Sequence, residues 1–175
     1  MGNVGGEVRH YLINNSAPIH LFQAVTMKID RERRVLHSKY HTAGHLIAVV
    51  VEKENSELKA IKGHQFPEDA YIEFCGTVGD VDNFMTQINS RVSECIASGA
   101  IIRIEELFSD DVTTIAQDLP YELPKNTSLR ICHTTRFPPV PCGGTHVNTL
   151  EDTASLVIKK CKSKKNKTKM YYEVE

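Results

Sequence analysis

The sequence predicts an α+β fold, with an antiparallel sheet and helices packed on one side of it. Three observations lead to this prediction. Short apolar segments of strand length recur along the 175-residue chain, separated by turn residues. Two segments carry apolar residues at helical spacing. The composition, 41% hydrophobic and 25% charged, is that of an ordinary globular domain, and this length can bury a core without disulfides.

The N-terminal part predicts a short β extension. Residues 8–13 and 21–27 are apolar segments that we expect to form strands. Two strands alone are only marginally stable, so this part either packs on the main domain or is the remnant of a larger N-terminal module. We therefore expect an extension over residues 1–36 and a main domain over residues 37–175, with a charged connector at residues 30–34.

The main domain is expected to begin with an apolar helix over residues 40–51. Residues 61–66 and 71–76 then predict two strands around a turn. A second helix follows, capped by Asp80 or Asp82. Its apolar residues recur on one face, namely Val81, Phe84, Met85, Ile88, Val92 and Ile96.

The second half of the chain predicts mainly strands. A short helix is expected to begin at Asp110, and a proline-rich bend over residues 137–141 leads to Cys142. The last two strands are expected to form a hairpin. Strands are predicted over residues 101–104, 129–133, 154–158 and 170–174.

Charge is unevenly distributed along the chain. The net charge is −1, so the protein as a whole does not attract nucleic acid, yet seven of its 21 basic residues lie from Lys159 to Lys169. One interpretation is a solvated hairpin turn. The other is a local patch that contacts phosphates, with Lys164 and Lys165 as candidate contacts, and the two interpretations are compatible.

Cysteine usage and hydropathy indicate a cytoplasmic protein. The five cysteines are odd in number and show no paired framework, which favours thiols that are free or bound to metal. We expect no signal peptide, because the first six residues are small and polar. We also expect no membrane association, since the apolar run at residues 46–51 is too short to span a bilayer.

Two short motifs about a hundred residues apart supply four candidate metal ligands. His41 and His45 lie four residues apart on the first helix, so both imidazoles can reach one ion. Cys142 and His146 flank two glycines, which permit a tight turn. Either motif alone is more often a chance pattern, but together they form a nitrogen and sulfur ligand set suited to one Zn²⁺ per chain.

The residues around these ligands resemble a known family. The segments HTAGHL, at residues 41–46, and PCGGTHVNT, at residues 141–149, resemble the editing domain of alanyl-tRNA synthetases and the free-standing AlaX trans-editing proteins. The editing domain of threonyl-tRNA synthetases is also similar, but less closely. The resemblance runs from about His37 to the C-terminus, and residues 5–10 resemble the end of the barrel-like N-terminal domain of longer AlaX proteins.

The resemblance implies an aminoacyl-tRNA deacylase that acts in trans at the acceptor end of tRNA. It implies hydrolysis of mischarged Ser-tRNA(Ala) or Gly-tRNA(Ala) at a zinc-containing site within an editing-type fold. Gly44 stands where alanyl-tRNA synthetases generally carry threonine, which would widen the pocket wall. The candidate catalytic residues are His64, Glu73 and Thr42, and the candidate substrate contacts near the cluster are Gly63, Gly144 and Thr145.

Several alternatives stay open at this level. Four protein ligands fill a tetrahedral zinc ion, so a catalytic metal would require Cys142 to bind loosely or the coordination to expand. The chain could instead be a non-catalytic zinc-containing module that binds tRNA, or an enzyme that edits Ser-tRNA(Thr). A different esterase or amidase with a small substrate is a further possibility. His64 could act as a base, contact the terminal adenosine or simply face solvent. Glu73 could hold a zinc-bound histidine, and Thr42 could cap backbone.

Overall fold

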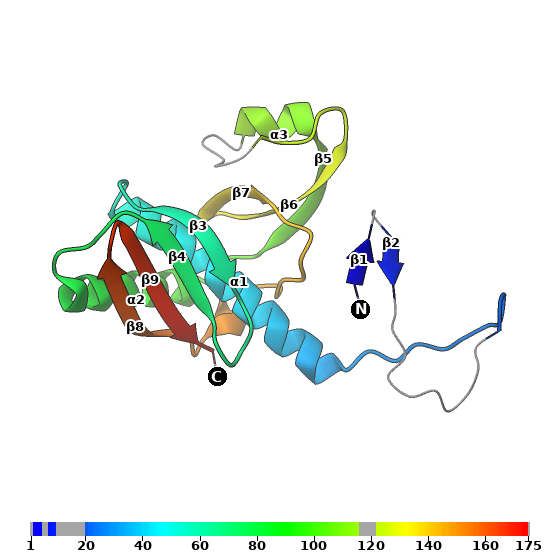
Figure 1. The fold of residues 1–175 in the computed structure, drawn as a ribbon, viewed down its shortest axis with the longest axis horizontal. Coiled ribbons are helices and arrows are strands. Elements are labelled where there is room, and N and C mark those ends of the chain that lie inside the picture. Colours follow the sequence, from blue (N-terminus) through cyan, green and yellow to red (C-terminus); the bar gives the residue numbers. More distant parts are fainter. Residues whose placement is uncertain (1, 5–6, 10–19, 116–121, 175) are drawn as a thin grey trace.

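The chain forms two larger antiparallel sheets, and one of them packs against two long helices, as the computed structural model shows (Figure 1). The structure describes residues 2–4, 7–9, 20–115 and 122–174. The predicted α+β class is confirmed. In chain order the elements are β1 (Gly2–Val4), β2 (Glu7–Arg9), α1 (Arg31–Glu54), β3 (Lys59–His64), β4 (Tyr71–Cys75), α2 (Val81–Ala97), β5 (Arg103–Phe108), α3 (Ser109–Ile115), β6 (Ser128–Thr134), β7 (Phe137–Pro141), the 3₁₀ turn η1 (Leu150–Thr153), β8 (Val157–Lys164) and β9 (Lys167–Glu173).

The larger sheet has the strand order β3-β4-β9-β8, and every neighbouring pair is antiparallel. Strand β9 therefore lies inside the sheet, between β4 and β8. The β8–β9 hairpin turns at Lys165 and Asn166, where the sequence predicted a turn. Both residues have positive φ, 53° and 57°, as a two-residue type I′ turn requires.

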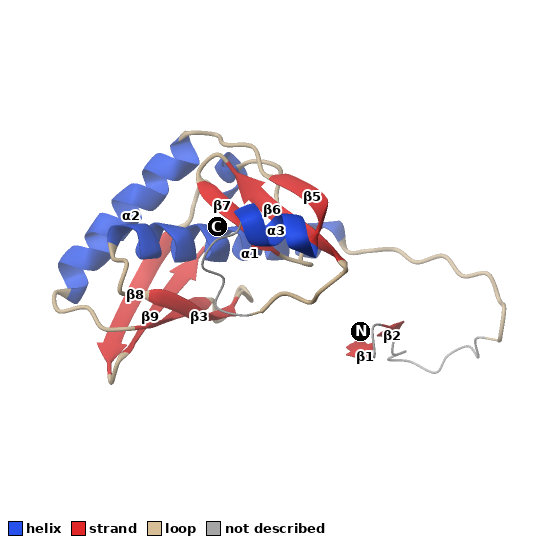
Figure 2. Cartoon of the chain, turned by 90° about the horizontal axis from the view of Figure 1, so that it is seen from above, coloured by secondary structure: helices blue, strands red, loops and turns tan. Residues whose placement is uncertain are grey.

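One face of this sheet is buried, and the other is open. Helices α1 and α2 cover the buried face, and Figure 2 shows both on one side of the β8–β9 hairpin. Side chains alternate between the two faces of a strand, so every second residue enters the core. The buried residues of β4 and β9 are Ile72, Phe74, Thr168, Met170 and Tyr172.

Helix α1 begins well before the predicted start at residue 40. The Asp30 side chain accepts a hydrogen bond from the Arg33 N–H at 3.0 Å, which satisfies a free donor of the first turn. The prediction of a connector over residues 30–34 is therefore wrong, because this cap and good helix formers start the helix there. The expected boundary between residues 36 and 37 falls inside α1.

Helix α2 follows its predicted pattern. The Asp80 side chain caps it by accepting from the Asn83 N–H at 3.1 Å. The helix ends close to Gly99, which has a φ of +59°. Its buried residues recur every four positions, as predicted: Phe84, Ile88, Val92 and Ile96.

The smaller sheet, β5-β6-β7, departs from the prediction in two places. Residues 137–141 form strand β7 and not only a bend, because an edge strand tolerates proline. Strand β5 begins at Arg103, not at residue 101. Ile101 and Ile102 bond instead to the segment before η1, through a bridge to Thr149 and a 2.8 Å hydrogen bond to the Asn148 carbonyl.

The predicted N-terminal strands are only partly present. Strand β2 covers residues 7–9, and the rest of the predicted strand over residues 10–13 lies outside the described residues. Residues 21–27 form no strand and are exposed. A strand needs a paired neighbour to satisfy its backbone N–H and C=O groups, and this segment has no such neighbour in the described part of the chain. No helix in the described part of the chain has the length and apolar character needed to cross a bilayer.

Candidate metal centre

Helix α1 and the loop after β7 bring the four predicted ligands to one point. The potential ligand atoms of His41, His45, Cys142 and His146 all lie within 4.8 Å of one another. The Nε2 atoms of His41 and His45 are 3.2 Å apart. The Cys142 Sγ lies 3.3 Å from the Nε2 of His41 and 3.4 Å from the Nε2 of His146.

These separations fit a tetrahedral zinc site. Zn–N bonds of about 2.0–2.1 Å and Zn–S bonds of about 2.3 Å place neighbouring donors about 3.3–3.6 Å apart. Three of the six donor pairs, at 3.2–3.4 Å, are close to the edges of such a tetrahedron, and all six lie within 4.8 Å. Three imidazole nitrogens and one thiolate are also donors that zinc prefers.

Hydrogen bonds on the far side of two rings orient these imidazoles. The Nδ1 of His41 lies 3.2 Å from the Thr145 carbonyl oxygen, which can only accept, so the proton is on Nδ1. The Nδ1 of His146 lies 3.1 Å from the hydroxyl of Thr42. In His41 this leaves the lone pair of Nε2 directed at the cluster, which is the tautomer that a metal needs, and the Thr42 hydroxyl can accept from the Nδ1 of His146 in the same tautomer.

Burial keeps the three histidines neutral. Burial, together with the smaller effects of the neighbouring His41 and His146, lowers the pKa of His45 to about 3. Burial is also the largest cause that lowers the pKa of His146 to about 4, and His41 and Arg130 contribute to this value. Burial is likewise the largest cause of the lowered pKa of His41. Neutral imidazole is the form that binds metal, so the site is prepared for a cation.

Arg130 on β6 fixes the loop that carries the other two ligands. Its Nη1 donates to the carbonyl oxygens of Cys142 at 2.8 Å and Gly144 at 2.5 Å. The Cys142 N–H donates in turn to the Arg130 carbonyl at 2.8 Å. Sequence reasoning missed this residue, although a lone basic side chain beside the buried Ile131 and Cys132 is a signal that could have identified it.

Arg130 also acts on the thiol. Burial raises the pKa of Cys142, while a hydrogen bond from the Gly144 backbone and the charge of Arg130 oppose the rise. The raised pKa keeps Cys142 as a thiol, and a bound cation would convert it to thiolate with release of a proton.

Gly144 passes so close to helix α1 that a side chain cannot fit. A Cβ at this position would overlap the imidazole of His41. The neighbouring Gly143 has no atom within 4 Å of such a Cβ. The second glycine of the motif is therefore required by close approach, and the first is not.

The structure brings some of the other predicted residues to the cluster. Thr42 is buried and positions His146, and its hydroxyl also accepts from the Val147 N–H at 3.3 Å. The Thr145 hydroxyl lies 2.9 Å from that of Ser38. Gly144 lies against His41, as described above.

The space beside Gly44 is filled, which corrects the expectation of a widened pocket wall. A Cβ there would lie 2.6 Å from the Nε2 of Gln65 and 2.9 Å from the hydroxyl of Tyr172. The Gln65 amide also lies against Gly63, at 3.2 Å from a Cβ placed on that residue. Gln65 thus occupies the position between Gly63 and the helix.

The remaining predicted residues contact other groups. His64 stacks on Tyr71 with ring centroids 5.4 Å apart. The Glu73 carboxylate pairs with Lys167 at 2.7 Å and Lys169 at 3.4 Å, so lysines and not a cluster histidine hold it. Its pKa is lowered, chiefly by the Lys167 hydrogen bond. The candidate phosphate contacts Lys164 and Lys165 are exposed at the end of the β8–β9 hairpin.

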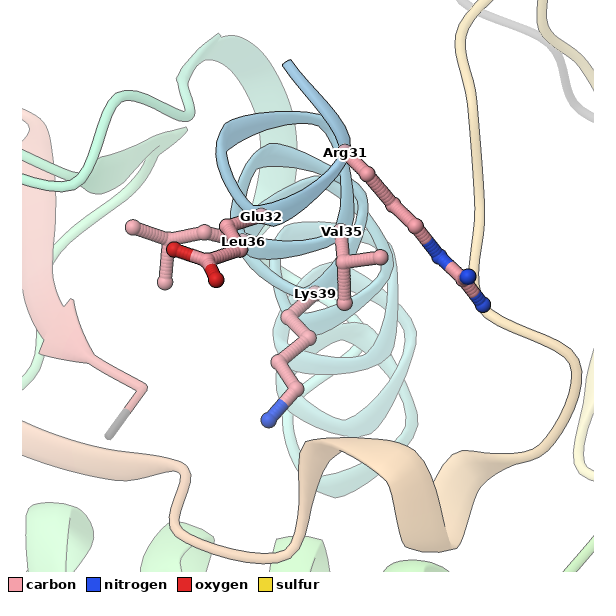
Figure 3. Close-up of a pocket in the computed structure, with 5 residues that line it drawn as sticks. All are labelled: Arg31, Glu32, Val35, Leu36 and Lys39. Carbon is pink, nitrogen blue, oxygen red and sulfur yellow. The ribbon is translucent and has the colours of Figure 1, made fainter.

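A separate pocket of about 470 Å³ lies along the first turns of α1. Figure 3 shows the five side chains that line it, which project from the helix before His41. They are Arg31, Glu32, Val35, Leu36 and Lys39. The apolar members Val35 and Leu36 are exposed.

The fold and the cluster define an α+β protein with a mixed imidazole and thiol site of the kind that binds zinc. No protein family model matches the chain. Comparison with curated proteins is more specific. The chain is similar to the alanyl-tRNA editing proteins called AlaX-M and, over a much smaller share of their length, to alanine–tRNA ligases.

The AlaX-M protein of Methanosarcina barkeri is 31% identical over 154 residues, which are 82% of this chain and 60% of that protein. The AlaX-M protein of Methanosarcina acetivorans is 26% identical over 186 residues, covering 98% of this chain and 73% of the relative. The alanine–tRNA ligase of Aster yellows witches'-broom phytoplasma is 26% identical over 146 residues, 78% of this chain and 16% of the ligase.

These matches confirm the resemblance that the two motifs indicated. The chain spans only about 60% of the length of the first of these AlaX-M relatives.

Proposed function

We propose that this protein hydrolyses mischarged aminoacyl-tRNA in trans, with Ser-tRNA(Ala) or Gly-tRNA(Ala) as the substrate. In this reaction water adds to the ester carbonyl, and the bond from that carbon to the ribose oxygen of the terminal nucleotide breaks. The products are the free amino acid and a tRNA whose ribose hydroxyl has taken up a proton. Relatives with the name of alanyl-tRNA editing proteins support this proposal.

The main support for the proposal is that four potential metal ligands from two distant segments of the chain lie together. His41, His45, Cys142 and His146 would hold one zinc ion per chain. Bound zinc supplies a Lewis acid that can polarise a carbonyl or a water, or bind the amino group of the aminoacyl ester.

The residues around the cluster have supporting roles in this proposal. Thr42 and the Thr145 carbonyl orient two imidazoles, and Gly144 permits the loop to approach the helix. Arg130 holds the loop and adds a fixed positive charge beside the cluster, where negative charge develops on an ester oxygen. Gly63, next to Gln65, would border the substrate.

The β8–β9 hairpin supports tRNA as the partner. Its exposed lysines, with Lys164 and Lys165 at the turn, would contact phosphates near the acceptor end. We take the residues before α1 as an N-terminal extension of the main domain. The exposed Val35 and Leu36 on the first turns of α1 would then lie where this extension meets the main domain.

Deacylation assays test the proposal. Zinc-loaded protein is incubated with Ser-, Gly- and Ala-tRNA(Ala) and with Ser-tRNA(Thr), alongside a His45→Ala variant. We expect one mischarged tRNA(Ala) species to be hydrolysed, Ala-tRNA(Ala) to be spared and His45→Ala to be inactive. His20→Ala is the matched control, because this exposed histidine lies on a segment that precedes α1.

The other outcomes identify the alternatives. Hydrolysis of Ser-tRNA(Thr) alone would change the substrate but not the reaction. Zinc and tRNA binding without hydrolysis of any species would indicate a non-catalytic module. Turnover of small esters that tRNA does not affect would indicate a different esterase.

A further inference from the structure

A row of five aromatic rings runs from helix α1 onto the open face of the larger sheet. The rings of His37 and Phe66 lie 5.7 Å apart, those of Phe66 and His64 5.0 Å, and those of His64 and Tyr71 5.4 Å. Tyr71 continues to Tyr171 on the neighbouring strand at 5.7 Å. We call these five residues the aromatic row.

The row begins beside the candidate metal centre. His37 precedes the candidate ligand His41 by four residues on α1. Residues four apart on a helix lie on the same face, one turn from each other. The first ring of the row is therefore a neighbour of the cluster, although its chain position is outside both ligand motifs.

The row ends among lysines. The Lys169 Nζ lies over the ring of Tyr71, 3.9 Å from its centroid, and 6.0 Å from that of Tyr171. The Lys162 Nζ lies 5.7 Å from the Tyr171 centroid. These two lysines are cross-strand partners in the β8–β9 pair, so the rings lead into the basic hairpin.

The row faces away from the core. Ile72 and Tyr172 are buried against the helices, so the alternate residues Tyr71 and Tyr171 lie on the opposite face of the same strands. Phe66 is 54% exposed, which is unusual for a ring that contacts two others. Among the described elements, α1 and α2 contact the sheet on its other face.

Rings interleaved with cations are suited to unpaired nucleotides. Bases stack on aromatic rings when they are not engaged in a duplex, and nearby lysines neutralise the phosphates between them. Phe66, which is 54% exposed, and Tyr171, at the far end of the row, are the rings on which bases would stack. A group of rings that only stabilises the fold would be covered by other residues and would not require neighbouring lysines.

We propose that the aromatic row binds the single-stranded 3′ end of an RNA by stacking, and directs its last nucleotide toward the candidate metal centre. This proposal rests on the proposed function, because it takes tRNA as the partner. It goes further in assigning the surface that holds the unpaired end. It also assigns His64 to contact with RNA and not to bond cleavage.

Binding of uncharged RNA tests this surface without any hydrolysis. A labelled six-nucleotide RNA that ends in CCA is titrated with zinc-loaded protein, and binding is followed by fluorescence anisotropy. A blunt RNA duplex serves as the competitor that lacks an unpaired end. We expect the single strand to bind more tightly than the duplex.

Variants of the row give the decisive comparison. Phe66→Leu keeps an apolar side chain and removes the ring, and Tyr171→Ala removes a second ring. Each should weaken binding of the single strand by about tenfold or more, because stacking on one ring contributes that much per base. Phe108→Ala is the matched control, since Phe108 is 56% exposed but lies on β5. Zinc content and melting temperature must stay at wild-type values in all three.

Each remaining outcome decides between the two proposals. Equal binding by Phe66→Leu, Tyr171→Ala and the wild type, or preference for the duplex, would overturn the stacking surface while leaving deacylation intact. Row-dependent binding without deacylation would support the surface and reject the enzyme. If both proposals hold, Phe66→Leu should raise KM for mischarged tRNA with little change in kcat.

Discussion

At the residue scale, Thr42 acts on the candidate metal centre through another side chain. Its hydroxyl contacts Nδ1 of the His146 ring, so that Nε2 faces the cluster and the Cys142 sulfur. Its residue type and motif position predicted involvement in the site, but not this role. The contact joins segments about a hundred residues apart, and no local pattern encodes such a pairing.

Replacing Thr42 tests this positioning role. Thr42→Val keeps the shape of the side chain and removes the hydroxyl, so His146 loses its partner and the Val147 N–H loses its acceptor. We expect zinc affinity to fall about 10- to 100-fold, measured by competition with a chromophoric chelator. Thr77→Val, at an exposed threonine, should bind zinc as the wild type does. Equal zinc affinities of Thr42→Val and Thr77→Val would contradict the positioning role of Thr42.

The two glycines of the loop provide a second residue-scale prediction. Gly144→Ala must displace the His41 imidazole, whereas Gly143→Ala meets open space. We expect Gly144→Ala to lose at least tenfold in zinc affinity, because one of four ligands moves out of place. Metal content after gel filtration, measured by mass spectrometry, compares the pair. Retention of full zinc content by Gly144→Ala would show that the loop can move away from α1.

At the element scale, the sequence predicted regular amphipathic elements better than irregular ones. The face of α2 was predicted correctly, since four apolar residues repeat at helical spacing and Asp80 supplies the cap. The start of α1 was missed, because its first two turns are charged and exposed and carry no apolar pattern. Strand β7 was also missed, since its prolines indicate a turn when its place at the sheet edge is unknown.

The β4–β9 pair leads to a pH prediction. Glu73 on β4 pairs with Lys167 and Lys169 on β9, and the lysines lower its pKa below the ordinary 4.5. The unfolded chain therefore binds more protons near that pH, so stability from this carboxylate is present above pH 4.5. It is lost as the pH falls through the lowered folded-state pKa.

Melting temperatures measured across pH check this sign. Glu73→Gln should melt below the wild type at neutral pH, and the two curves should converge in acid. High salt should reduce the difference, because the Glu73 side chain is 13% exposed and its lysines are more so. Glu68→Gln, in an exposed turn, should follow the wild type throughout. A difference that is the same at every pH would contradict the ionic origin.

At the scale of the whole molecule, the candidate metal centre links the start of the main domain to its last third. A cation there would cross-link α1 to the loop after β7. The sequence identified the four residues that converge there, because each pair is local and carries the spacing of its element. The sequence did not indicate two separate sheets, since strand partners are set by packing across the entire chain.

Removal of the metal tests this cross-link. If zinc is present at a thousand times its dissociation constant, it adds about 4 kcal/mol to the free energy of unfolding. Treatment with a chelator should therefore lower the melting temperature by on the order of ten degrees, and added zinc should restore it. The His45→Ala variant should have a low melting temperature that neither the chelator nor added zinc changes. A zinc-loaded wild type that melts unchanged after chelation would show that the metal does not stabilise the fold.

The position of β9 within the larger sheet also has a consequence for biosynthesis. Strand β4 gains its second neighbour only from β9, which also supplies the buried Met170 and Tyr172. A nascent chain that has emerged only as far as residue 160 thus exposes the partly formed core of α1 and β4. We expect such intermediates to be captured by ribosome-associated chaperones, and the domain to fold only after β9 has left the ribosomal tunnel.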